Sequence, residues 1–150
     1  MREALRLAVE SARSGNGGPF AALVVKDGEI VGRGCNGVTG ANDPTAHAEI
    51  EAIRDACRRL GTFRLNDCDI YCSSEPCPMC LGAIYWARLE RVYYSNDREI
   101  AAEAGFDDAF IYDEISRPVG RRVLPTRHLT LTGADEAFAV WKALADRVEY

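Results

Sequence analysis

The chain has 150 residues, 47% of them hydrophobic, which suits a single compact domain over residues 1–150 with a substantial core. The net charge is −5 and the isoelectric point is near 5.1, so a polyanionic substrate such as nucleic acid is disfavoured. No stretch approaches the roughly 18 uncharged apolar residues of a membrane helix, and the N-terminus lacks the apolar run of a signal peptide. Six cysteines without such a signal predict a reducing, cytoplasmic setting.

The first part of the sequence predicts a helix followed by a β-hairpin. Apolar residues recur at helical spacing over residues 3–13, and a stretch rich in glycine and proline then breaks the helix. Residues 20–26 and 30–35 are expected to be strands, because they flank Asp27-Gly28-Glu29, a sequence typical of tight β-hairpins.

The next helix is expected to carry the first of two motifs with metal-binding side chains. Asp43 followed by Pro44 is typical of an N-cap with proline at the first helical position. This pattern predicts a helix over residues 44–59 that ends at Gly61. His47 would then lie near the start of that helix.

The second motif follows a short apolar strand expected at residues 69–73. The prolines on both sides of Cys77 are tolerated only in the first turn of a helix, so a helix is expected over residues 79–86. Cys77 and Cys80 would lie on one side of its N-terminus, where the helix dipole favours a thiolate.

The rest of the chain continues the alternation of helices and strands. Residues 91–95 are expected to form a strand, and residues 106–115 and 136–148 two helices. The sequence leaves open whether residues 128–131 form a further strand. The alternation predicts an α/β sandwich.

His47, Cys77 and Cys80 are ligands of the types that zinc prefers. Three such ligands leave the fourth corner of a tetrahedron for water, which is typical of a catalytic zinc site, and we expect one zinc ion per chain. Glu49 is then the expected carrier of that water's proton, and a His-x-Glu segment followed by Pro-Cys-x-x-Cys is a signature of zinc deaminases. On a regular helix His47 and Glu49 would diverge by about 200°, so both serve one site only if the side chains bend inward around the helix end.

Two other interpretations of the cysteine pair have less support. Cys77-x-x-Cys80 alone would also suit a thioredoxin-like redox pair or half of a structural zinc site. A structural site needs a fourth ligand, and the only other histidine, His128, lies far along the chain. Neither interpretation gives Glu49 a role, so the sequence favours catalytic zinc.

The whole chain resembles the cytidine-deaminase-like superfamily and, within it, the bacterial guanine deaminases. The superfamily core is His47-Ala48-Glu49 with Pro76-Cys77-Pro78-Met79-Cys80. The tRNA adenosine deaminases share the segment around His47, but they lack the Gly-Phe-Asp-Asp run at residues 105–108. The segments that carry the closer resemblance are Gly17-Gly18-Pro19-Phe20, Asn42-Asp43-Pro44-Thr45, Leu81-Gly82-Ala83-Ile84-Tyr85-Trp86-Ala87-Arg88 and Ala101-Ala102-Glu103-Ala104-Gly105-Phe106-Asp107-Asp108.

The resemblance implies a three-layer α/β/α sandwich with a five-stranded mixed sheet, and a homodimer with exchanged C-terminal segments. It implies hydrolysis of guanine to xanthine and ammonia. In that reaction Glu49 moves the proton of the water to a ring nitrogen, and Asp108 helps to protonate the leaving amino group.

The resemblance also implies residues that bind the substrate. Asn36 is expected to hydrogen-bond the carbonyl edge of the purine, and His47 to lie beside the base as well as on the zinc ion. Phe20 and Trp86 resemble pocket aromatics, although Trp86 would equally suit a buried core position. Tyr150 resembles the terminal aromatic residue that closes the pocket of the neighbouring subunit.

Other functions use the same residues and stay open on the sequence alone. Guanosine, an aminotriazine such as ammeline, or cytosine would be deaminated by the same zinc chemistry. A tRNA adenosine deaminase is disfavoured by the acidic isoelectric point. A non-catalytic zinc module would bind zinc but release no ammonia.

Overall fold

The structure is a computed structural model that describes residues 1–149. Tyr150, which was expected to close the partner's pocket, lies outside the described residues. The chain divides into two compact units, Met1–Phe110 and Ile111–Tyr150.

The first unit is built on a mixed β-sheet. Its strands have the order β2-β1-β3-β4, with β1 antiparallel to both β2 and β3, and β3 parallel to β4. The hairpin between β1 and β2 turns at Asp27 and Gly28, which both have positive φ as a tight two-residue turn requires. The four strands are β1 (Ala21–Lys26), β2 (Glu29–Cys35), β3 (Cys68–Ser74) and β4 (Arg91–Asn96).

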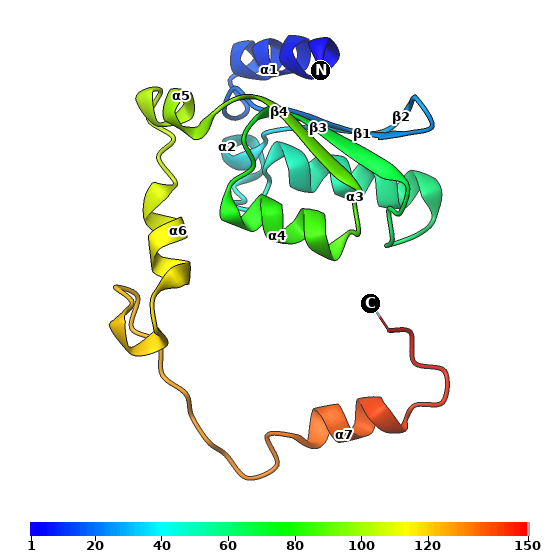
Figure 1. Ribbon diagram of the computed structural model, residues 1–150, viewed down its shortest axis with the longest axis vertical. Helices are drawn as coiled ribbons and strands as arrows, with labels where there is room; N and C mark the ends of the chain where they lie inside the picture. Colours follow the sequence, from blue (N-terminus) through cyan, green and yellow to red (C-terminus); the bar gives the residue numbers. More distant parts are fainter. Residues whose placement is uncertain (150) are drawn as a thin grey trace. The chain divides into compact units, whose positions relative to one another are not determined.

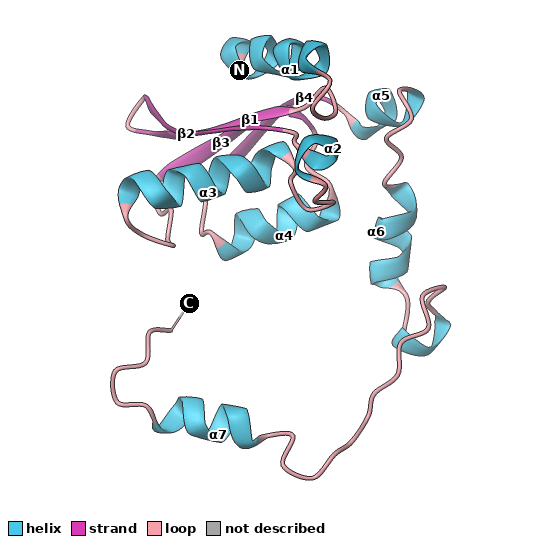
Figure 2. Ribbon diagram, turned by 180° about the vertical axis from the view of Figure 1, so that it is seen from behind, coloured by secondary structure: helices cyan, strands magenta, loops and turns pink. Residues whose placement is uncertain are grey.

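Helices cover both faces of this sheet, which gives three layers. Helix α1 (Arg2–Ser14) lies on one face, and α3 (Ala48–Leu60) and α4 (Pro78–Trp86) lie on the other (Figure 1). Figure 2 shows the same arrangement from behind. Two short helices, α2 (Val38–Ala41) and α5 (Arg98–Glu103), were not expected from the sequence.

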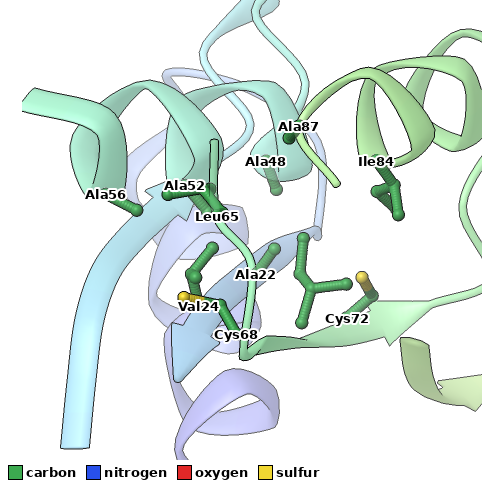
Figure 3. Packing of buried hydrophobic residues seen from close by; sticks show 11 residues of the cluster. Ala22, Val24, Ala48, Ala52, Ala56, Leu65, Cys68, Cys72, Ile84 and Ala87 are labelled. Atoms are coloured by element: carbon green, nitrogen blue, oxygen red, sulfur yellow. The ribbon is translucent and has the colours of Figure 1, made fainter. Parts of the chain in front are cut away.

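The hydrophobic core lies between the sheet and the pair α3 and α4 (Figure 3). Helix α3 contributes Ala48, Ala52 and Ala56, which share one face because they are four residues apart. Strand β2 faces these small side chains with two glycines. A Cβ atom on Gly34 would overlap the carbonyl oxygen of Ala48, and one on Gly32 would overlap that of Ala52, so helix and strand touch backbone to backbone.

The expectation of a fifth strand was wrong for the described residues. Residues 128–131 are irregular, and the side chains of Leu129 and Leu131 are 73% and 69% exposed. An isolated extended segment is not stable as a strand without a neighbour to take its hydrogen bonds, and no described strand pairs with it.

The second unit has little packing of its own. It contains most of α6 (Ala109–Ser116), a 3₁₀ turn over Val119–Arg121 and α7 (Glu136–Ala143). None of its described residues is buried. No helix in the described part of the chain has the length and apolar character needed to cross a membrane.

Three predicted helices have different bounds in the structure. The helix predicted over residues 44–59 begins only at Ala48, because the Asp43 carboxylate closes a turn by accepting hydrogen bonds from the Thr45 N–H (2.8 Å) and hydroxyl (2.7 Å). The prediction that Asp43 is the N-cap was therefore wrong. The helices predicted over 106–115 and 136–148 are observed as α6 and the shorter α7.

Candidate active site

His47 and Glu49 serve one site because they stand on either side of a helix start. His47 is the N-cap residue of α3 and has extended backbone angles, φ −75° and ψ 153°. Glu49 is the second residue inside the helix, and its side chain is buried. The divergence expected on a regular helix therefore does not arise, since His47 precedes the helical geometry.

The two cysteines come from the start of α4, directly after β3. Cys77 is the N-cap residue of this helix, Pro78 is the first helical residue and Cys80 lies in the first turn. This confirms the predicted placement of both thiols at a helix N-terminus. The N-terminal end of α4 faces that of α3 closely enough for the three metal-binding side chains to meet.

The three predicted ligands have the spacing that zinc requires. The Nδ1 atom of His47 lies 3.5 Å from the Sγ of Cys77 and 3.5 Å from the Sγ of Cys80. With Zn–S bonds of about 2.3 Å and Zn–N bonds of about 2.1 Å, tetrahedral angles place N and S about 3.6 Å apart. The side chains present therefore fit a zinc ion.

The electrostatics of this cluster favour one thiolate even without metal. A hydrogen bond from Cys80, aided by His47, lowers the pKa of the Cys77 thiol to about 4. The same hydrogen bond and burial raise the pKa of Cys80, and the contact with Cys77 raises the pKa of His47. Cys77 is thus the thiolate and Cys80 the thiol of the metal-free pair.

Glu49 is a buried carboxyl group beside the zinc ligands. Its side chain is 8% exposed, and its Oε2 accepts a hydrogen bond from the Cys80 thiol at 3.4 Å. Burial raises the pKa of the Glu49 carboxyl, since the charged form is poorly solvated there. A carboxyl with a raised pKa holds and releases a proton closer to neutral pH, as a general acid–base group must.

These groups open onto a cavity of about 350 Å³ within the first unit. Its volume lies at the lower end of the range for small-molecule sites, which is roughly 300–1,000 Å³. The lining combines two of the three candidate zinc ligands, His47 and Cys77, with acids and with aromatic and small side chains. The lining residues are Gly18, Phe20, Asn36, Val38, Thr39, His47, Glu49, Glu75, Cys77, Arg98, Ala101, Gly105, Phe106, Asp107 and Asp108.

Asn36 has the orientation needed to donate a hydrogen bond to a ligand. It is buried, and its Oδ1 accepts hydrogen bonds from the backbone N–H groups of Gly18 (3.0 Å) and Val38 (3.3 Å). Because the oxygen is held by the backbone, the amide nitrogen is the group left to donate into the cavity that Asn36 lines.

Two aromatic rings form one wall of the cavity. Phe20 and Phe106 meet edge to face with ring centroids 4.9 Å apart. Gly18 lies against both rings, and a Cβ there would stand 3.0 Å from Phe20 and 3.2 Å from Phe106. Because Gly18 has no side chain, both rings can lie close to its backbone.

The two acids that follow Phe106, Asp107 and Asp108, have different structural roles. Asp107 accepts a hydrogen bond from the Ala109 N–H at 2.9 Å and so closes the turn that leads into α6. Asp108 lines the cavity, and burial together with the charge of Cys77 raises the pKa of its carboxyl. Asp108 is thus a second carboxyl group that faces the same space as Glu49.

Comparison with known proteins identifies the family. Residues 1–96 match the family described as the cytidine and deoxycytidylate deaminase zinc-binding region. The chain belongs to this family of zinc deaminases. The arrangement of His47, Cys77 and Cys80, which could hold a metal ion, agrees with membership of a zinc-binding deaminase family.

Relatives of this deaminase include one that matches along the whole chain. A guanine deaminase from Bacillus subtilis (strain 168) is 53% identical over 150 residues, covering 100% of this chain and 96% of the relative. An X-ray structure of guanine deaminase from Bacillus subtilis superposes with a TM-score of 0.97 over 99% of this chain and 95% of that chain. A tRNA-specific adenosine deaminase from Aquifex aeolicus (strain VF5) is 48% identical, but over only 51% of each chain.

The structure does not bring every predicted substrate residue of the deaminase to the cavity. Among the described residues, Phe20, Asn36, His47, Glu49 and Asp108 line it, as predicted from the sequence. Trp86 is not among the lining residues; it ends α4 with 64% of its side chain exposed, and so it is not a core residue of the single chain either.

Glu75 and Arg98 are charged residues that line the cavity of the deaminase and that sequence reasoning missed. Glu75 lies two residues before Cys77, so its closeness to the metal motif was an available signal. Arg98 lies in the unexpected helix α5, and nothing in the local sequence pattern pointed to a site there.

Proposed function

We propose that the protein hydrolyses guanine to xanthine and ammonia. The full-length similarity to a guanine deaminase supports this substrate, because the tRNA-specific relative matches only about half of the chain. The small cavity also suits a free base better than a polynucleotide. The acidic isoelectric point agrees, since phosphate chains are bound by clustered cations.

The observation that carries the proposal is the second carboxyl group. Removing the amino group of guanine requires a proton on a ring nitrogen and a proton on the departing nitrogen, at two places on the ring. Glu49 and Asp108 line one cavity, and burial raises the pKa of both carboxyls, so both keep a proton to a higher pH than an exposed carboxyl does.

The zinc ion, when bound, supplies a nucleophile at neutral pH by lowering the pKa of water. Glu49 accepts a proton from the attacking water and passes it to a ring nitrogen of guanine, which makes carbon 2 more electrophilic. Glu49, helped by Asp108, then delivers a proton to the amino group, which departs as ammonia. Atoms balance as guanine plus water giving xanthine plus ammonia.

The other lining residues hold the base in place. The Asn36 amide nitrogen donates to the carbonyl oxygen of the purine, because its own oxygen is already held by two backbone N–H groups. The edge-to-face pair Phe20 and Phe106 offers an apolar wall for the ring system.

An ammonia-release screen tests the substrate. Guanine, guanosine, adenine, cytosine, cytidine and ammeline are each incubated with the zinc-loaded protein, and guanine is expected to have the highest kcat/KM. A higher value for guanosine or ammeline would replace guanine as the substrate while keeping the deaminase chemistry. Zinc retention without ammonia from any of the six would contradict the assignment.

We also propose that the working form is a homodimer in which each C-terminal segment completes the partner's deaminase domain. The second unit supports this, because a segment with no buried described residue needs an outside surface for its apolar side chains. The most exposed of these are Val123, Leu124, Leu129, Leu131 and Phe138. The exchanged segment includes Tyr150, which we propose covers the partner's cavity.

A further inference from the structure

We propose that Glu75 is a positioning residue whose carboxylate ties the zinc-binding loop to helix α5 and thereby places Phe106 and Asp108 against the cavity. This inference rests on the proposed function. Glu75 is half-buried, lines the cavity and lies two residues before Cys77. Its Oε2 accepts a hydrogen bond from the Arg98 N–H at 3.2 Å, and its own N–H donates to the Asn96 carbonyl at 2.8 Å.

The contact with Arg98 satisfies a backbone group that a helix cannot satisfy itself. The first N–H groups of a helix have no partner within it. In α5 the Asp97 carboxylate accepts from the Ile100 N–H at 3.0 Å, and Glu75 takes the Arg98 N–H. Asp97 belongs to the same segment as α5, whereas Glu75 directly follows the neighbouring strand β3. Of these two carboxylates, only Glu75 therefore links the helix to the zinc-binding loop.

The far end of α5 is fixed equally well. The Gly105 N–H donates to the Ala102 carbonyl at 2.9 Å, and the Phe106 N–H donates to the Ala101 carbonyl at 3.0 Å. This is the Schellman pattern, in which a glycine with positive φ ends the helix; Gly105 has φ +92°. A short helix with both ends fixed passes a shift at Arg98 on to Phe106.

Phe106 and Asp108 are the groups that such a shift would move. The Phe106 ring packs edge to face against Phe20 in one wall of the cavity, and Asp108 follows Phe106 by two residues. Misplacing a reacting group by about 1 Å costs about a hundredfold in rate. Glu75 would thus affect catalysis through the placement of Asp108, without itself moving a proton.

The variants are chosen to separate this role from a direct one. Glu75→Ala removes the acceptor, whereas Glu75→Gln keeps a carbonyl oxygen that can accept from the Arg98 N–H. Glu99→Ala is the matched control, because Glu99 is an exposed acid in the first turn of the same helix. All three are expected to keep one zinc per chain, which shows that the metal site is intact.

The first measurement needs no substrate. Hydrogen–deuterium exchange is followed over residues 98–108 in the zinc-loaded protein. Exchange there is expected to rise about tenfold or more in Glu75→Ala and to stay near the wild-type rate in Glu75→Gln and Glu99→Ala. Unchanged exchange in Glu75→Ala overturns the positioning role, whatever the substrate is.

The second measurement is ammonia release from guanine. Glu75→Ala is expected to lose about ten- to a hundredfold in kcat, and Glu75→Gln to recover most of it. Because Glu75 acts through Asp108, the double variant Glu75→Ala/Asp108→Asn should match Asp108→Asn alone to within about threefold. Losses that multiply mean that Glu75 does not act through Asp108, which overturns the inference. A wild-type protein that releases no ammonia from guanine refutes the proposed function instead and leaves the exchange result to decide Glu75.

Discussion

The two-residue spacing of His47 and Glu49 has a structural explanation in the start of α3. His47 has extended backbone angles, and its imidazole can therefore turn toward the cysteines, while Glu49 is already helical and buried. A ligand just outside a helix and an acid just inside it meet at the same point. The spacing would fail in the middle of a helix, where such side chains diverge.

The acid of this pair can be tested alone. Glu49→Gln is expected to keep zinc and fold but to lose about 10²- to 10⁴-fold in kcat, because an amide cannot carry the proton. Glu51→Gln is the matched control, since Glu51 lies in the same turn and pairs on the surface with Arg54. Zinc content and turnover are measured for both. A loss below about tenfold in Glu49→Gln would assign the proton transfer to another group.

The cysteines differ in how their reactivity depends on pH. In zinc-stripped protein, alkylation of Cys77 should proceed at a nearly constant rate from pH 6 to pH 8, because a thiol with a pKa of about 4 is already ionised throughout. Mass spectrometry of iodoacetamide-treated protein measures this rate, and added zinc should abolish the reaction.

Cys35 serves as the internal control for this experiment. It is exposed, and burial of part of its thiol raises its pKa above the ordinary 9.0. Its thiolate fraction, and hence its alkylation rate, should rise about tenfold for each pH unit over the same range. A Cys77 rate that rose as steeply would show that the neighbouring thiol and imidazole do not stabilise its thiolate.

Local motifs account for the part of the site that the sequence predicted. The predicted zinc ligands and Glu49 lie in two short segments. The spacing of these residues within each segment is what predicted the site. Glu75 was missed as a functional residue because its partner, the Arg98 N–H, lies 23 residues away in a helix that the sequence pattern did not reveal. Trp86 was assigned to the pocket by resemblance, and only the placement of the whole helix α4 shows where its ring lies.

At the scale of elements, the contact between β2 and α3 also supports the metal site. Gly34→Ala would drive a methyl group into the carbonyl oxygen of Ala48, the residue next to His47. We expect a loss of about 1–3 kcal/mol in the free energy of unfolding, measured by urea titration. We also expect a lower affinity for zinc.

The control for this substitution is Gly82→Ala. Gly82 lies within α4, and a Cβ there has no heavy atom within 4 Å. Alanine should raise the free energy of unfolding by about 0.5–1 kcal/mol, because glycine is a poor helix former. Equal effects of the two substitutions would mean that the close approach of β2 and α3 does not matter.

The elements that were predicted well are those whose signals are local. The hairpin at Asp27-Gly28 and the proline-led start of α4 follow from residues in immediate contact. The start of α3 was misplaced because the Asp43 carboxylate bonds to Thr45 in a turn, which competes with the capping role of the same side chain. The fifth strand was expected from the resemblance, and among the described residues the sheet has four strands.

At the scale of the whole molecule, the second unit differs from the first because most of its large apolar side chains are exposed. Its apolar side chains are exposed, Val123 to 79% and Leu124 to 75%. Burying such residues is the main favourable term in folding and association, so a surface that covers them would stabilise the protein. The homodimer proposed above supplies such a surface from the partner chain.

A mixing experiment tests whether the C-terminal segment acts in the partner. One chain lacks residues 149–150 and keeps Glu49; the other is full-length and carries Glu49→Gln. The two are mixed after reversible dissociation. In a mixed dimer the intact site would be covered by the partner's segment, so activity should recover to roughly one quarter of wild type, because half of randomly formed dimers are mixed and each has one working site.

The control mixes the shortened chain with a shortened Glu49→Gln chain. This second chain lacks residues 149–150 and so cannot cover its partner's site. Ammonia release and the proportion of mixed dimers, from native mass spectrometry, are recorded together. If mixed dimers form and activity stays at the sum of the parents, the segment does not act in the partner. A protein that remains monomeric contradicts the proposed homodimer directly.

The match to the deaminase family ends at residue 96, which is the last residue of β4, and α5 begins two residues later. The metal chemistry and the wall that carries Asp108 therefore occupy successive stretches of the chain. Glu75 joins them through a backbone N–H, a group that every residue except proline offers at position 98. Replacing residues 97–108 would accordingly alter the wall that carries Phe106 and Asp108, while His47, Cys77, Cys80 and Glu75 lie outside the replaced stretch.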